Sequence, residues 1–169
     1  MPTKYEEMCE AARNGRKNRN DYRERCWGCM NQILNGFLAY TETPLNTVTY
    51  LRWNGLLGEA STYEAADEGH RYASAGATVL GEDGFWNLGI RIALSAGAII
   101  SFVLFVAEQD GKLVAKVGTS GKLYTLDLSN QHTCNELYDD IVAKAKSAFD
   151  ERRKPEQKLI GFAGQLPPD

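Results

Sequence analysis

The chain lacks the motifs on which several common enzyme classes depend. It has only two histidines, His70 and His132, among 169 residues. It contains no G-x-x-x-x-G-K-[ST] phosphate loop, no G-x-G-x-x-G dinucleotide loop, no G-x-S-x-G elbow and no H-E-x-x-H zinc motif. These absences argue against P-loop nucleotidases, Rossmann dehydrogenases, α/β-hydrolases and zincin proteases. We therefore expect a binding protein rather than an enzyme, and we expect no cofactor.

Long apolar runs are also scarce. The longest, residues 96–107, covers about a dozen positions, whereas a spanning helix needs about 20. The N-terminus does not show the basic, apolar and small-residue order of a signal peptide. We therefore expect a cytoplasmic protein without a membrane partner. In that compartment the four cysteines (Cys9, Cys26, Cys29 and Cys134) are expected to be reduced.

The remaining composition is that of a globular protein. The chain is 43% hydrophobic and 24% charged, and its length suits a single domain. We predict an α+β fold in which an antiparallel sheet of four to five strands, with a meander over residues 85–128, packs against three helices. These are a long N-terminal helix, a middle helix and a C-terminal helix. The domain is expected over residues 1–153, and the proline- and glycine-containing segment 154–169 is expected to be extended or mobile.

The meander is predicted from alternation and turn residues. Residues 85–94 alternate between apolar and polar positions, which is typical of a strand with one buried face and one wet face. Residues 99–107 are apolar at successive positions, as in a central strand covered on both faces. Asp110-Gly111 is a favoured hairpin turn into residues 112–117, and a further turn precedes residues 122–128. A separate strand is predicted over residues 47–53.

The helices are predicted from apolar spacing and from capping residues. A helix-prone segment over residues 4–12 is expected to end or kink at Asn14-Gly15, and a longer helix follows from about residue 20 until Thr43-Pro44. Ser61 with Glu64, and Thr133 with Glu136, resemble capping boxes. They predict a middle helix over residues 61–72 and a final helix over residues 133–153.

Charge is distributed unevenly along the chain. Between residues 13 and 25 six basic residues stand against two acidic ones, a local net charge of +4, while the remainder carries −7. This cluster is either the solvated face of a helix or a surface for an acidic partner or nucleic acid. The pI near 5.5 argues against a dedicated nucleic-acid binder. The basic patch consists of Arg13, Arg16, Lys17, Arg19, Arg23 and Arg25.

The cysteines offer two possible reactive arrangements. Cys26 and Cys29 form a C-x-x-C pair inside a predicted helix, on its apolar face, where buried hydrophobic packing is the favoured interpretation. A zinc site of Cys26, Cys29, His132 and Cys134 has suitable ligand types, but its second pair lacks the usual spacing. Alternatively, Cys134 in the first turn of the last helix is a candidate nucleophile with His132 as its base. No third orienting group can be identified.

Three functions remain open at this point. The first is a non-enzymatic binding protein of accessory, inhibitor, immunity or chaperone type, whose partner is another protein or a second copy in a homodimer. The second is a small-molecule binder or enzyme with a pocket between sheet and helix. The third is nucleic-acid binding through residues 13–25. Candidate pocket residues, chosen by type, are Tyr50, Trp53, His70, Arg91 and Tyr124.

Overall fold

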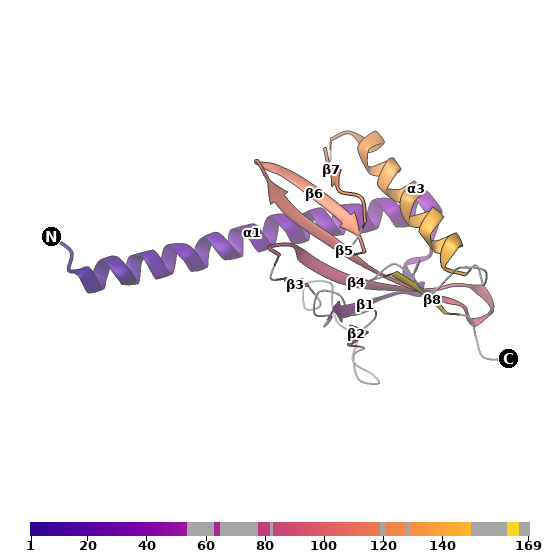
Figure 1. Cartoon of the computed structure of the whole chain (residues 1–169), viewed down its shortest axis with the longest axis horizontal. Helices are drawn as coiled ribbons and strands as arrows, with labels where there is room; N and C mark the ends of the chain where they lie inside the picture. Colours follow the sequence, from indigo (N-terminus) through magenta and orange to yellow (C-terminus); the bar gives the residue numbers. More distant parts are fainter. Residues whose placement is uncertain are drawn as a thin grey trace.

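A computed structural model describes residues 1–53, 63–64, 78–81, 83–118, 121–127, 129–149 and 162–165 of the chain (Figure 1). An antiparallel sheet forms one layer, and two helices, α1 (Lys4–Thr41) and α3 (Gln131–Ala148), form the other. The predicted α+β class with an antiparallel sheet is therefore confirmed. No helix in the described ranges combines the length and the hydropathy needed to cross a membrane.

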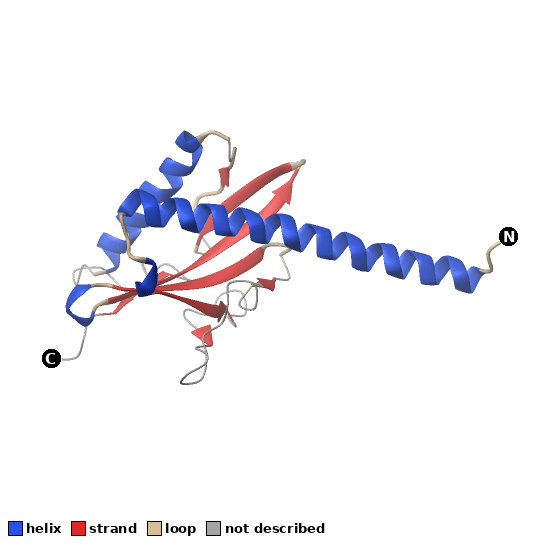
Figure 2. Ribbon diagram, turned by 180° about the vertical axis from the view of Figure 1, so that it is seen from behind, coloured by secondary structure: helices blue, strands red, loops and turns tan. Residues whose placement is uncertain are grey.

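Helix α1 is much longer than the sheet that it covers. Its 38 residues span about 57 Å at 1.5 Å per residue. Its first half projects beyond the body of the molecule, and its second half lies against the sheet (Figures 1 and 2). The buried side chains accordingly all lie in the second half: Cys26, Cys29, Met30, Ile33, Leu34, Phe37 and Leu38.

The helix is continuous, so the predicted break at Asn14-Gly15 is wrong. Thr3 caps the N-terminus through a reciprocal capping box with Glu6, which satisfies backbone donors of the first turn. A Cβ at Gly15 would meet nothing within 4 Å. The glycine therefore lowers helix stability by about 1 kcal/mol without obstructing the helix. The predicted stop at Thr43-Pro44 is confirmed, because α1 ends at Thr41.

The sheet is built outward from two long central strands, β4 (Trp86–Ala93) and β5 (Ile99–Gln109), which pair antiparallel. The main path runs β2-β1-β4-β5-β6-β7. Beyond β5 lie β6 (Lys112–Val117) and β7 (Tyr124–Thr125), so the predicted meander corresponds to β4 to β7 in chain order. Beyond β4 lie β1 (Val48–Trp53) and β2 (Tyr63–Glu64).

Two short strands extend the central pair at its ends. Strand β3 (Val79–Leu80) joins β4 on the edge that β1 also occupies, and β8 (Phe162–Gln165) joins β5 on the edge that β6 also occupies. Strand β8 belongs to the C-terminal segment that was expected to be extended or mobile. It is extended, and it forms part of the sheet.

The main core lies between the sheet and the two helices. It contains alternate residues of the central strands, among them Leu88 and Ile90 of β4 and Phe102 and Leu104 of β5. These side chains meet the buried residues of α1 and those of α3, namely Cys134, Leu137, Tyr138 and Ile141. The alternation read from the sequence therefore identifies the helix-covered face of the sheet.

The opposite face of β4 and β5 is also buried, so the predicted wet face of residues 85–94 is wrong. Asn87 is 3% exposed, and Val103 and Phe105 form a second apolar cluster on this face with Phe85, Ala107 and Val114. The rings of Phe85 and Phe105 meet edge to face, and the Lys116 ammonium lies 4.7 Å from the Phe85 centroid. Aromatic rings thus cover this face of the sheet, although the polar positions among residues 85–94 had indicated that it would be in contact with water.

The last two helix predictions also need correction. Tyr63 and Glu64 form strand β2 beside Trp53 and Arg52, so the middle helix is wrong at these two positions because cross-strand pairing prevails over the local capping pattern. The other residues of that prediction lie outside the described ranges. Helix α3 begins at Gln131 rather than at Thr133, since the side chain of Asp127 accepts from Ser129 and starts the turn earlier.

Candidate functional site

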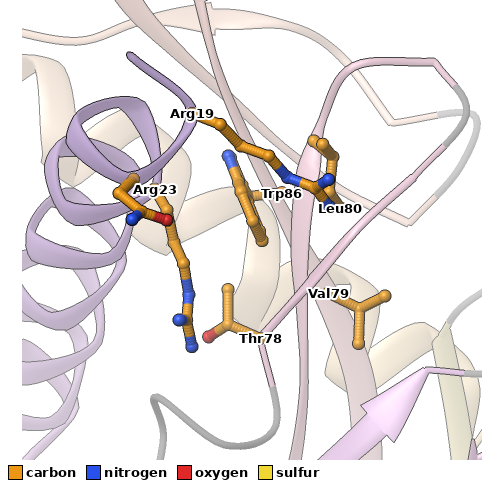
Figure 3. A pocket seen from close by; sticks show the side chains of 7 residues that line it. Arg19, Arg23, Thr78, Val79, Leu80 and Trp86 are labelled. Carbon is orange, nitrogen blue, oxygen red and sulfur yellow. The ribbon is translucent and has the colours of Figure 1, made fainter. Parts of the chain in front are cut away.

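A pocket opens between the middle of α1 and the edge of the sheet where β3 joins β4 (Figure 3). Its volume is about 580 Å³, within the range typical of small-molecule sites. The described residues that line it come from three segments and are Arg19, Asn20, Arg23, Thr78, Val79, Leu80 and Trp86. Two guanidinium groups therefore face an apolar wall, and no carboxylate lies among these described lining residues.

Helical spacing places the two arginines on one face of α1. Arg19 and Arg23 are four residues apart, which sets their side chains one turn apart along the helix. Arg19 is exposed and Arg23 is half-buried. The guanidinium carbon of Arg23 lies 6.0 Å from the centroid of the Trp86 ring, within the range of a cation–π contact.

Tyr22 fixes α1 against the sheet beside this pocket. Its hydroxyl donates to the Gly84 carbonyl at 3.0 Å and accepts from the Glu108 amide at 3.2 Å. Its ring also packs 6.4 Å from that of Trp86. Burial raises the pKa of Tyr22, so the neutral hydroxyl that makes both bonds is the stable form.

An ion pair next to Tyr22 strengthens the same junction. The Nε of Arg25 donates to the Glu108 carboxylate at 2.6 Å. This hydrogen bond raises the pKa of Arg25. Because Tyr22 and Arg25 both bond to Glu108 of β5, the orientation of Arg19 and Arg23 relative to the sheet is determined by two polar contacts as well as by the core.

Trp86 carries a buried donor without an acceptor. The residue is 4% exposed, and its Nε1 has no hydrogen-bond partner among the described residues. In the view of Figure 3 its indole stands between the side chains of Arg19 and Arg23. A buried N–H without a partner costs about 1–3 kcal/mol. The Nε1 atom is itself buried, so this unsatisfied donor lies in the interior beside the pocket rather than on its open surface.

The pocket residues predicted by type do not converge in one place. Tyr50 pairs with Ile90 on the helix-covered face of the sheet, whereas Arg91 pairs with Thr49 and Ser101 on the opposite face. Burial raises the pKa of Tyr50, and the Nε of Arg91 is buried without a partner among described residues. Trp53 ends β1 opposite Tyr63. His70 lies outside the described residues.

Tyr124 lines a second, smaller pocket of about 330 Å³, formed by β7 and α3 together with Lys122, Leu123, Thr125, Thr133 and Glu136. The Lys122 ammonium lies 5.1 Å from the centroid of the Tyr124 ring. A cation and a carboxylate both line this pocket. It therefore has less net charge to attract an ion than the arginine pocket.

The cysteines are placed for packing. Cys26, Cys29 and Cys134 are buried in the main core, and all four cysteines are free thiols. Burial, followed by the proximity of Cys26 and Cys134, raises the pKa of Cys29 to about 12, so it stays a neutral thiol near neutral pH. Within the described ranges no group of three or more His, Cys, Asp or Glu residues is arranged to hold a metal ion.

The hypothesis that Cys134 is a nucleophile assumed that Thr133 caps the last helix, and the structure does not show that cap. Because α3 begins at Gln131, Thr133 is not its N-cap; the Thr133 hydroxyl bonds to the backbone of Asp127 and Asn130 instead. Cys134 is 5% exposed. Of His132, only the backbone position within α3 is described, so its side chain adds nothing to the hypothesis.

The basic patch divides into three structural groups. Arg13, Arg16 and Lys17 are exposed on the projecting half of α1, Arg19 and Arg23 line the pocket, and Arg25 pairs with Glu108. Sequence reasoning missed Trp86, Thr78, Val79 and Leu80 as site residues. The spacing of Arg19 and Arg23 was the available signal, but it does not reveal which strand lies opposite.

The comparisons with known proteins add no family to these observations. No protein-family model, no curated protein and no solved structure matches the chain.

Proposed function

We propose that this protein is a non-enzymatic binding protein of accessory, inhibitor, immunity or chaperone type, and that it acts through the projecting half of α1. The observation that carries the proposal is the exposure of that helix. Every residue from Lys4 to Asp21 is exposed except the half-buried Cys9. Tyr5 is 71% exposed and Met8 is 64% exposed, although both are large apolar side chains.

A helix in this position has little to stabilise it in the monomer. Isolated helices shorter than about 12–15 residues are marginal in water, and most helical stability in proteins comes from packing. The projecting half also contains Asn14, Gly15, Asn18 and Asn20, which are poor helix formers. A partner that covers Tyr5 and Met8 would supply the packing that the body does not.

We propose that this partner is a second copy of the chain, because the molecule exposes both a basic segment and acidic residues that could pair between two copies. Arg13, Arg16 and Lys17 form an exposed basic segment of the projecting half, whereas the residues outside 13–25 carry a net charge of −7, to which Glu6, Glu7 and Glu10 at the start of α1 contribute. Exposed carboxylates lie at the far end of α1 and on the neighbouring α3, at Glu42, Glu136 and Asp139. A two-fold pair with antiparallel α1 helices would bring the basic segment at residues 13–17 of each copy toward acidic residues of the other.

The molar mass of the full chain in solution, which reports its oligomeric state, tests this proposal. Light scattering across a range of protein concentrations should give a dimer that dissociates as salt is raised, because exposed charges are screened. Arg13→Glu with Lys17→Glu should shift the equilibrium to monomer by at least tenfold. The matched control, Lys112→Glu with Lys122→Glu, makes the same change in net charge on exposed lysines of the sheet and should remain dimeric.

A monomer at all concentrations would refute self-association, and so would equal weakening by both double variants. Binding of the wild-type chain to a DNA or RNA duplex with a steep salt dependence, without dimerisation, would instead favour the nucleic-acid alternative through residues 13–25.

A second candidate function, small-molecule binding, is favoured by one specific observation, the pocket lined by Arg19, Arg23 and Trp86. It is independent of dimerisation.

A further inference from the structure

The projecting half of α1 (Figure 2) carries a row of charges whose sign reverses at its middle. Four exposed charged residues follow one another at helical spacings of four, three and four positions, so their side chains lie in one row along the helix. They are Glu6, Glu10, Arg13 and Lys17. The first half of the row is acidic and the second half is basic.

This order of charges is unfavourable within a single helix. Glu6 and Glu10 are like charges four positions apart, and so are Arg13 and Lys17, and such pairs destabilise a helix. Glu10 and Arg13 have opposite charges three positions apart, but none of the salt bridges within the described residues involves any of the four. Opposite charges supplied by another molecule would relieve both repulsions.

A second row with the same spacing runs beside the first, one position earlier in the chain. It consists of Tyr5, Cys9, Ala12 and Arg16. An aromatic ring therefore stands at one end of this row, small residues at its centre and a guanidinium group at its other end. Met8 borders the row, because it is three positions from Tyr5 and four from Ala12. Tyr5 is 71% exposed and Met8 is 64% exposed.

We propose that the projecting halves of two copies pair antiparallel through these two rows, about a two-fold axis near Ala11. This inference rests on the self-association proposed above and names the surface that each copy offers to the other. The antiparallel pair sets Glu10 opposite Arg13 of the second copy, and position 6 opposite position 17, so each charge of the row meets its opposite. A parallel pair would set like charges against each other.

The second row is self-complementary under the same symmetry. Tyr5 of one copy lies opposite Arg16 of the other, where the ring and the guanidinium group form a cation–π pair. Cys9 lies opposite Ala12, and these small side chains allow the two helices to approach closely. Contact along both rows covers the apolar side chain of Tyr5 and extends to Met8 at the border.

The carboxylates at the other end of α1 fit the basic segment less well. In an antiparallel pair that set Arg13 opposite Glu42, position 14 would already lie opposite Thr41, where the other α1 ends. Tyr5 and Met8 would then lie beyond the end of that helix. The pair centred near Ala11 instead keeps both side chains beside the other projecting half.

Reversal of the central charges tests the register. In light scattering at low salt, Glu10→Arg and Arg13→Glu should each raise the dissociation constant of the dimer at least fivefold, because each sets like charges face to face. Combining the two changes exchanges the charges and keeps the net charge of the chain. The combined variant should return to within twofold of wild type. Glu6 is left unchanged because it caps α1.

Glu24→Arg is the matched control. It makes the same change of charge as Glu10→Arg at another exposed position of α1, but it lies outside the two rows. Its dissociation constant should stay within twofold of wild type. A loss equal to that of Glu10→Arg would show that net charge alone governs the association, and would overturn the proposed register.

Cysteine cross-linking tests the orientation. Two proteins are made in a Cys9→Ala background, one with Tyr5→Cys and the other with Arg16→Cys. In the antiparallel pair position 5 lies opposite position 16 of the other copy, whereas the two copies of position 5 are about 16 Å apart along the helices at 1.5 Å per residue. A disulfide does not span that distance. Oxidation with copper phenanthroline should therefore give a covalent dimer in the equimolar mixture and in neither protein alone.

The outcomes separate this register from self-association itself. The register is overturned, with self-association intact, if wild type dimerises but the combined variant stays as weak as Arg13→Glu, or if either cysteine protein cross-links alone. A wild-type chain that is monomeric at every concentration would overturn both. Recovery in the combined variant, together with a cross-link in the mixture alone, supports the contact.

Discussion

Gly36 of α1 lies directly beneath the hydroxyl of Tyr138 of α3. A Cβ built at position 36 would be 2.1 Å from the phenolic oxygen, well inside van der Waals contact. Tyr138 is 1% exposed, and its ring also packs against Phe37 and Tyr40 of α1. The absence of a side chain at Gly36 therefore allows the two helices to approach, although a glycine weakens α1 by about 1 kcal/mol relative to alanine.

The first prediction concerns this contact. Gly36→Ala should lower the free energy of unfolding by about 1–3 kcal/mol, because overpacking against Tyr138 outweighs the gain in helix propensity. Urea denaturation measures the change. Gly28→Ala is the control, since its Cβ would meet nothing within 4 Å, and it should stabilise the protein by about 0.5–1 kcal/mol. If the two variants were equally stable, the proposed steric conflict would not exist.

The second prediction concerns Tyr22. Tyr22→Phe removes the acceptor for the Glu108 amide and the donor to the Gly84 carbonyl. The loss of both hydrogen bonds should destabilise the fold by about 1–3 kcal/mol. Tyr40→Phe provides a comparison, because its hydroxyl donates to Asp139 at an exposed position. That variant should change stability by less than about 0.5 kcal/mol in the same thermal or urea unfolding measurement.

The third prediction concerns alkaline pH. The pKa of Cys29 is raised to about 12 in the folded protein from an ordinary value near 9. Its contribution to stability is complete below pH 9, where the thiol is neutral in both states. Above pH 9 the unfolded state loses the proton first, so the free energy of unfolding should fall by up to about 1.4 kcal/mol per pH unit toward pH 12.

Urea denaturation at several values between pH 8 and 10.5 measures this slope. Cys29→Ala should flatten it relative to wild type, even if the variant is less stable at every pH. Burial also raises the pKa of Tyr138 and Cys26, so the variant should retain part of the slope. An unchanged slope in Cys29→Ala would contradict the elevated pKa.

The fourth prediction concerns the projecting half of α1. In dilute, monomeric protein, amide hydrogens between residues 4 and 20 should exchange within seconds to minutes, because that part of the helix lacks tertiary packing. Amides between residues 26 and 38, where α1 is buried, should exchange near the global unfolding rate. Raising the protein concentration should protect residues 4–20 selectively. Protection that does not depend on concentration would count against a second copy as the partner.

The sequence predicted those parts of the fold that depend on periodicity. Alternation across residues 85–94 identifies the side chains of β4 that face the helices, and the Asp110-Gly111 turn identifies the hairpin, where both residues have positive φ. Thr43-Pro44 marks the end of α1. In each case a local physical preference agrees with the final structure.

The errors arose where tertiary contacts outweigh local preferences. Tyr63 and Glu64 carry a helix-start pattern, but they pair with β1. Asn87 was expected in solvent, but it is buried on a second apolar face. The candidate site was missed for a related reason. Arg19 and Trp86 are 67 positions apart in the chain, so only the packing of α1 on β4 brings them to one pocket.

The projecting half of α1 has a hydrodynamic consequence. A body with a long rod attached experiences more friction than a sphere of equal mass, so it diffuses slowly and tumbles faster about the rod axis than across it. On a gel-filtration column the monomer should elute early and imitate a larger compact species. Sedimentation velocity should show a raised frictional ratio for the monomer.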